Sequence, residues 1–290
     1  MTITSFETKS TSTPITLELA DVAEQLQRST VQVRSDRLSG GSGVIWNSDG
    51  LIITNAHVAP KERATVELND GRVFEAVVTT KDSHRDLAAL QINATDLPAA
   101  TIGNSDTLRV GELVMAVGNP LGIVGALTTG IIHATNSQKW VMADVRLLPG
   151  NSGGSLANAQ GQVIGINTMI ADGLALAVPS KVVERFLKGE RTPKLGVTLR
   201  PVLVNLGNMP VLGLLILEVE AGSSAIEAGL QIGDVLIKVC GQFFNTPDDL
   251  ISAIAYTEPG ELLSLEFLRG GKHLVSSVVL HGGTFGVKAA

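Results

Sequence analysis

The chain has 290 residues, of which 44% are hydrophobic and 3% aromatic, and its formal net charge at pH 7 is −6. This length is enough for two domains with hydrophobic cores, and the hydrophobic fraction excludes a largely disordered chain. The acidic balance without a basic run argues against nucleic acid as a partner. The apolar runs are too short for a membrane span.

The predicted elements begin with a polar, flexible arm at residues 1–14, followed between Ile15 and Ser35 by a short amphipathic helix and a strand. Short apolar runs then alternate with turn residues as far as Ser180. Turn signals at residues 47–50 (NSDG) and 69–71 (NDG) predict two hairpins. Roughly a dozen short strands with almost no helix favour an antiparallel barrel or sandwich.

The pattern changes after Ser180. Val182, Val183 and Phe186 recur at helical spacing, and Gly189 is a typical helix stop. The polar stretch 189–194 reads as a linker, and a second unit that mixes strands with two helices begins at residue 195. We therefore expect one domain at residues 15–188 and a smaller one at residues 195–283.

The first residues lack a basic segment followed by an apolar one, so the sequence as written predicts a cytoplasmic protein. The mature form of a periplasmic or secreted protein would lack this signal as well. The single cysteine, Cys240, excludes an intramolecular disulfide. Because it follows an apolar, strand-like run, we interpret Cys240 as a small core residue.

Ser152 lies among glycines in PGNSGGS, residues 149–155. Such a stretch is ordinarily a flexible loop, but glycines around a nucleophile would let the backbone aim N–H groups at an oxyanion. The G-x-S-x-G elbow of α/β-hydrolases needs a helix after the serine and a later histidine in the same fold. Here a strand follows, and His273 and His281 lie in the second unit. The remaining interpretation is a triad in the chain order His, Asp, Ser, which is the order found in chymotrypsin-type barrels.

The residues before Ser152 supply candidates for a base and an orienting acid. His57 ends the apolar run LIITNAHV, where a lone histidine is more often satisfied by local hydrogen bonds. Asp86 immediately precedes the run LAALQI, where a partly buried carboxylate needs a strong donor such as an imidazole N–H. For Asp86 alone, a strand-entry cap is an equally good interpretation. The other candidates are His84, His133, Asp70, Asp82, Asp106 and Asp144.

Several blocks in order, including GSGVIWNSDGLIITNAHV, DSHRDLAAL and DVRLLPGNSGGSLANAQGQVIGINT, resemble the HtrA (Deg) family of serine proteases across residues 30–185. The resemblance implies a mostly β fold with a chymotrypsin-like double β-barrel protease domain. It implies that Ser152 attacks the peptide carbonyl, that His57 is the base and that Asp86 fixes its tautomer. The N–H groups of Gly150 and Ser152 would form the oxyanion hole. No metal or other cofactor is expected.

Residues 195–281 resemble a PDZ domain, a smaller α+β unit. Its AGL-x-x-GD block at residues 228–234 is interpreted as a structural turn and strand. The resemblance places a peptide carboxylate on the backbone N–H groups of Leu195, Gly196 and Val197, with the peptide added as a strand beside the next one.

The resemblance therefore implies a serine endopeptidase for unfolded or damaged proteins, whose PDZ domain binds peptide C-termini. It also implies a homotrimer packed through the N-terminal region, where Phe6 is the one aromatic residue. The alternative is a peptide-binding chaperone or scaffold with an inactive protease domain. The sequence departs from the family pattern in four places. Ser155 replaces a usual proline, Arg146 replaces a small residue, and segments 129–144 and 167–178 look shorter than the usual regulatory loops.

Overall fold

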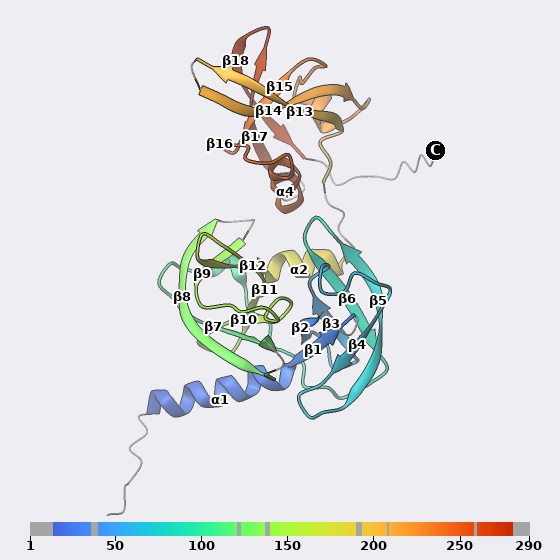
Figure 1. The fold of residues 1–290 in the computed structure, drawn as a ribbon, viewed down its shortest axis with the longest axis vertical. Coiled ribbons are helices and arrows are strands. Elements are labelled where there is room, and N and C mark those ends of the chain that lie inside the picture. Colours follow the sequence, from blue (N-terminus) through green and yellow to red (C-terminus); the bar gives the residue numbers. More distant parts are fainter. Residues whose placement is uncertain are drawn as a thin grey trace, which may run out of the picture.

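The computed structural model describes residues 14–35, 40–120, 123–136, 140–189, 193–207, 209–257 and 260–280. Their strands form two closed barrels of six strands each and a separate sheet (Figure 1). The arm expected at residues 1–14 lies outside the described residues except for Pro14, and so does Phe6. Half of the expected linker is described, and residues 190–192 are not.

The first barrel has the strand order β1-β2-β3-β6-β5-β4. Its strands are β1 (Thr30–Arg34), β2 (Gly40–Ile45), β3 (Leu51–Thr54), β4 (Arg63–Glu67), β5 (Val73–Asp82) and β6 (Leu87–Ile92). Both expected hairpins are present, since the NSDG turn joins β2 to β3 and the NDG turn joins β4 to β5. The interior is filled by buried aliphatic side chains such as Val31, Ile52 and Leu90.

The second barrel has the order β10-β11-β12-β9-β8-β7. Its strands are β7 (Leu113–Gly118), β8 (Ala126–Asn136), β9 (Trp140–Asp144), β10 (Ser155–Asn158), β11 (Val163–Ala171) and β12 (Leu174–Pro179), preceded by the 3₁₀ turn η1 (Ser105–Thr107). Ile132, Leu156 and Ile164 belong to its core. The expected antiparallel double barrel is confirmed, and closure of each sheet removes the exposed strand edges.

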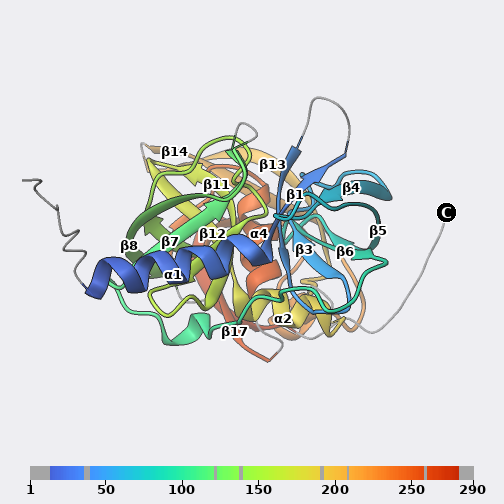
Figure 2. The same cartoon turned by 90° about the horizontal axis from the view of Figure 1, so that it is seen from below.

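A third core joins the two barrels. It contains Val44 and Leu87 from the first barrel and Met115 and Val178 from the second, all buried. Helix α1 (Pro14–Ser29) runs along the barrels (Figure 2) and inserts Leu26 into this core. Because the barrels are packed against each other, loops from both can be held at a fixed separation where they meet.

Helix α2 (Ser180–Leu187) confirms the helix expected after the second barrel. It buries Val182, Val183 and Phe186 against the core between the barrels. Gly189 has a φ of 71°, and its N–H donates to the Phe186 carbonyl at 3.0 Å. This is the left-handed residue that commonly ends a helix, so the expected stop at Gly189 is also confirmed.

The third sheet has the order β13-β14-β15-β17-β18, with β16 paired to β15. Its elements are β13 (Val197–Leu206), β14 (Met209–Val219), α3 (Ser224–Glu227), β15 (Val235–Val239), β16 (Gln242–Phe243), α4 (Asp248–Tyr256), β17 (Leu262–Arg269) and β18 (Lys272–Val279). The expected mixture of strands with two helices is confirmed. A separate core that includes Leu214, Leu236 and Phe267 stabilises this unit.

Asp234, from the AGL-x-x-GD block, is 1% exposed and accepts hydrogen bonds from Arg269 Nε and Nη2, both at 2.7 Å. It also accepts one from the Gln231 N–H at 2.8 Å, so it closes the turn before β15. The hydrogen bond with Asp234 raises the pKa of the Arg269 guanidinium above its ordinary value. These contacts support the structural interpretation of this block.

The interpretation of Cys240 as a core residue is wrong. Cys240 is exposed and has a φ of 50°, because the chain turns there between β15 and β16. Arg146 is also exposed, in the loop after β9. In the described part of the chain, no helix has the length and apolarity needed to cross a membrane.

Candidate functional site

His57 and Asp86 meet because β3 pairs antiparallel with β6. Thr54, the last residue of β3, lies opposite Ala88 near the start of β6. The turn after β3 therefore brings His57 beside Asp86. His57 Nδ1 lies 2.7 Å from Asp86 Oδ2, and the His57 backbone N–H donates to Asp86 Oδ1 at 3.0 Å. Both carboxylate oxygens are thus used by one residue, and the side chain of Asp86 is 19% exposed.

Asp86 adopts a left-handed backbone conformation, with a φ of 52°. This is uncommon for a residue with a side chain and needs support from the surrounding structure. The buried Asn55 provides it, since its Nδ2 donates to the Asp86 carbonyl at 2.9 Å and also to Thr168 Oγ1 at 3.0 Å. Asn55 therefore ties the turn of Asp86 in the first barrel to β11 in the second.

Ser152 lies in the loop between β9 and β10, where its glycine neighbours allow a close approach to the first barrel. Gly153 has a φ of 85°, and a Cβ atom there would lie 2.1 Å from the Ser42 carbonyl oxygen. Only glycine fits this position. The Gly153 N–H donates to the Asn167 carbonyl at 2.8 Å, and the Ser152 carbonyl accepts from the Ser42 N–H at 2.8 Å.

The N–H groups of Gly150 and Ser152 have no acceptor among the residues that the structure describes. By contrast, the intervening N–H of Asn151 donates to the Leu148 carbonyl at 3.0 Å. An oxyanion hole requires N–H donors without a partner in the protein, and two such groups lie here on either side of a bonded one. Gly150 and Ser152 are the two residues to which the family resemblance assigns the oxyanion hole.

The Ser152 hydroxyl does not donate to His57. It donates instead to the carbonyl of Thr168 at 2.9 Å, and Thr168 is 2% exposed on β11. The structure therefore brings two of the three predicted residues, His57 and Asp86, into direct contact. Ser152 has its own acceptor on the second barrel.

The other histidine and aspartate candidates occupy different places. His84 is exposed in the turn before Asp86, and its backbone N–H donates to Asp82 Oδ1 at 2.9 Å. Asp70 stabilises the turn between β4 and β5 through the Arg72 N–H at 3.0 Å. That hydrogen bond lowers the pKa of the Asp70 carboxyl. His133, Asp106 and Asp144 are exposed.

Three residues of this region were not singled out from the sequence: Ser42, Asn55 and Thr168. Each lies inside a block that resembles the protease family, but a serine, asparagine or threonine in a strand or turn has no distinctive local pattern. Their roles depend on hydrogen bonds between segments that are far apart in the sequence, such as Asn55 and Thr168, 113 positions apart.

A second candidate site is a groove of about 470 Å³ in the third unit. Leu195, Gly196 and Val197, the predicted carboxylate-binding residues, all line it, and so does Ile251 from α4. The carbonyls of Leu195 and Gly196 accept from Ala225 N at 3.0 Å and Glu220 N at 2.9 Å. Since C=O and N–H point in opposite directions in a trans peptide, the N–H groups of Gly196 and Val197 point away from these partners.

A further feature of this groove suits an extended ligand. β13 stands at the end of its sheet and pairs with β14 along one side, so its other edge is available to an added strand. Pro201, within β13, has no N–H to contribute to such pairing. His84 of the first barrel also lines the groove.

Ser155, which stands where a proline is usual, is fully buried at the start of β10. Its hydroxyl has no hydrogen-bond partner in the described part of the chain. We expect Ser155→Ala to raise the free energy of unfolding by about 1 kcal/mol, because it removes an unsatisfied buried polar group. Ser180→Ala is the matched control. Its hydroxyl, equally buried, donates to the Gly103 carbonyl at 2.7 Å, so this variant should lose stability. Chemical denaturation of both variants is the measurement, and a less stable Ser155→Ala would contradict the expectation.

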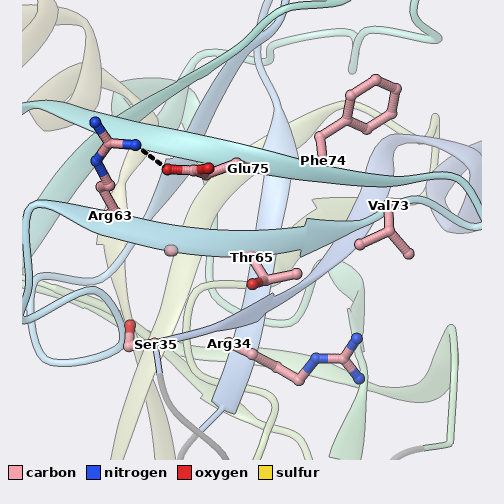
Figure 3. A pocket seen from close by; sticks show the side chains of 8 residues that line it. Arg34, Ser35, Arg63, Thr65, Val73, Phe74 and Glu75 are labelled. Carbon is pink, nitrogen blue, oxygen red and sulfur yellow. Dashed lines mark hydrogen bonds and ion pairs between the residues drawn. The ribbon is translucent and has the colours of Figure 1, made fainter.

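A depression of about 660 Å³ lies on the outer wall of the first barrel (Figure 3). The Arg63 guanidinium points at Glu75 and forms an ion pair with it, and Arg34 pairs with Glu67 at 2.6 Å. Since these charged groups already have partners, we assign no ligand to this depression.

Residues 41–166 match the model of the trypsin-like peptidase domain, and residues 193–280 match that of the PDZ domain. HhoB of Synechocystis sp. is 37% identical over 271 residues, which cover 82% of this chain and 65% of HhoB. The periplasmic pH-dependent serine endoprotease DegQ of Escherichia coli is 36% identical over 275 residues, covering 84% of this chain and 60% of DegQ.

Solved structures agree with these relatives over almost the whole chain. The serine endoprotease from Yersinia pestis has a TM-score of 0.63 and 28% identity, covering 95% of this chain and 100% of that one. The HtrA-type protease AlgW with a decapeptide has a TM-score of 0.61 and 27% identity, covering 92% of this chain and 99% of that one.

Proposed function

Because the chain belongs to the HtrA family, which joins a trypsin-like peptidase domain to a PDZ domain, we propose that it is a serine endopeptidase. Its substrates are unfolded or damaged proteins, and Ser152, His57 and Asp86 perform the hydrolysis. The observation that carries the proposal is the paired contact of Asp86 with His57, at 2.7 Å to Nδ1 and 3.0 Å to the backbone N–H.

In the proposed mechanism, the Asp86 carboxylate accepts a hydrogen bond from His57 Nδ1–H, which keeps the ring proton on Nδ1 and leaves Nε2 free to act as the general base. The Ser152 hydroxyl exchanges the Thr168 carbonyl for His57 Nε2 by rotation about its Cα–Cβ bond. Its oxygen then attacks the substrate carbonyl while His57 takes the proton and later passes it to the leaving amine. The carbonyl oxygen becomes an oxyanion that accepts from the N–H groups of Gly150 and Ser152. Water then hydrolyses the acyl-enzyme, again with His57 as the base.

The test is covalent labelling by a fluorophosphonate, which reacts with serines activated in this way. We expect one equivalent of label per chain, located at Ser152 by peptide mass spectrometry, together with digestion of unfolded casein that stops as labelling proceeds. A folded protein that neither takes up the label nor digests casein would instead support the chaperone or scaffold with an inactive protease domain.

We propose that the groove lined by Leu195, Gly196 and Val197 holds the C-terminal carboxylate of a peptide with an apolar last residue. The N–H groups of Gly196 and Val197, which point away from Ala225 and Glu220, suit an anion, and Ile251 supplies an apolar wall. Calorimetric titration of the full chain carrying Ser152→Ala should show binding of a peptide ending in valine. The same peptide with a C-terminal amide should bind at least about tenfold more weakly, because it lacks the charge. Equal affinities would contradict the assignment.

The compartment and the assembly are further parts of the proposal. The name of the relative DegQ places that protein in the periplasm, which favours the periplasmic alternative over the cytoplasmic expectation for this chain. We also propose a homotrimer, as the family resemblance implies. Sedimentation equilibrium of the full chain tests the trimer directly.

A further inference from the structure

We propose that Ser42 is a positioning residue for the oxyanion hole, and this inference rests on the proposed function. Ser42 lies on β2 of the first barrel and is fully buried. Its hydroxyl donates to the Gly150 carbonyl at 2.7 Å and accepts from the Asn119 N–H at 2.8 Å. Because the Asn119 N–H is only a donor, the hydroxyl proton must point at Gly150.

The peptide that Ser42 holds lies between the two oxyanion donors. Those donors are the N–H groups of Gly150 and Ser152, and the unit between them carries the Gly150 carbonyl and the Asn151 N–H. Ser42 Oγ holds the carbonyl end, and the Leu148 carbonyl holds the N–H end at 3.0 Å. If this unit rotated, the orientation of the two donors relative to each other would change.

Gly150 needs such a restraint because it lacks a side chain. Its φ is 104°, in a region open to glycine, and glycine also has wide freedom in the neighbouring dihedral angle. The backbone of Ser42 adds a second attachment, since its N–H donates to the Ser152 carbonyl at 2.8 Å. One residue of the first barrel thus holds carbonyls at both ends of the segment 150–152.

Ser42 is itself held in place from within the first barrel. The hydroxyl of Thr54, on β3, donates to the Ser42 carbonyl at 2.6 Å, and Thr54 is fully buried. The chain of contacts therefore runs from the end of β3, just before His57, through Ser42 to the donors beside Ser152. This arrangement fixes the oxyanion donors relative to the base, although they belong to different barrels.

The experiment compares full-length wild type, Ser42→Ala and Ser180→Ala. Ser180 is a matched control, because its buried hydroxyl also donates to a glycine carbonyl, that of Gly103 at 2.7 Å, and accepts a backbone N–H, that of Ser105 at 3.2 Å. The readouts are kcat and KM for a fluorogenic peptide with an apolar residue before the cleaved bond. A third readout is the inhibition constant of a peptide boronate, which forms a tetrahedral adduct.

For Ser42→Ala we expect kcat to fall by about 10- to 100-fold and the boronate to bind more weakly by a similar factor, with KM within about twofold of wild type. A purely structural role would not separate kcat from KM in this way, and Ser180→Ala should leave all three values unchanged. Equal kcat in Ser42→Ala and Ser180→Ala, or a loss confined to KM, would overturn the inference while leaving the proposed function intact.

Two further outcomes are distinguishable. If Ser42→Ala does not fold, Thr54→Val carries the same test, because it removes the hydrogen bond that holds the Ser42 carbonyl. A lower kcat at unchanged KM then supports the inference, and an unchanged kcat overturns it. If wild type neither cleaves the peptide nor binds the boronate, the proposed function itself fails, and the inference fails with it.

Discussion

Replacement of Ser152 by alanine should abolish digestion of unfolded casein and leave the chain folded. The variant removes the nucleophile, and loss of a nucleophilic serine in such a triad lowers kcat by roughly 10⁶-fold. The fold should survive because the side chain of Ser152 makes one hydrogen bond, to the Thr168 carbonyl. The free energy of unfolding should change by about 1 kcal/mol or less. The measurement is the rate of casein digestion by purified protein, with circular dichroism as the check on folding.

Ser155→Ala is the control for this variant, since it removes a neighbouring buried hydroxyl and leaves Ser152 in place. It should digest casein at the wild-type rate. Digestion by Ser152→Ala at the wild-type rate, in preparations free of contaminating protease, would show that another residue is the nucleophile.

Asp86→Asn should lower kcat by about 10⁴-fold at neutral pH, as the corresponding change does in other proteases with this triad. The His57 backbone N–H donates to one carboxylate oxygen of Asp86, and an asparagine would keep its carbonyl oxygen there. Its NH₂ group would then face His57 Nδ1. That nitrogen would have to become the acceptor, which moves the ring proton to Nε2. An imidazole protonated at Nε2 cannot accept the proton of Ser152.

The control is Asp144→Asn, an exposed aspartate at the end of β9. It should keep the wild-type kcat, and both variants should unfold at wild-type denaturant concentrations. Steady-state hydrolysis of a fluorogenic peptide is the measurement. If Asp86→Asn retained the wild-type kcat, Asp86 would be a strand-entry cap and not the partner of the base.

Local patterns in the sequence were enough to predict most of the fold. The NSDG and NDG turns, the alternation of short apolar runs and the helix that stops at Gly189 are determined by neighbouring residues. The closed barrels followed from the number of such strands together with the family resemblance. The prediction that Cys240 is a core residue failed because the apolar run before it looked continuous through Cys240. The chain in fact turns at that residue.

The sequence by itself also determined the candidate residues His57, Asp86 and Ser152, through their order and the blocks around them. Only the tertiary structure decided which atoms meet. The Ser152 hydroxyl is bonded to Thr168, and the Gly150 carbonyl is held by Ser42, 108 positions away. The physical reason is that a hydrogen bond between distant segments depends on atomic positions set by packing of the two barrels. These atomic positions cannot be predicted from residue types and their spacing along the chain.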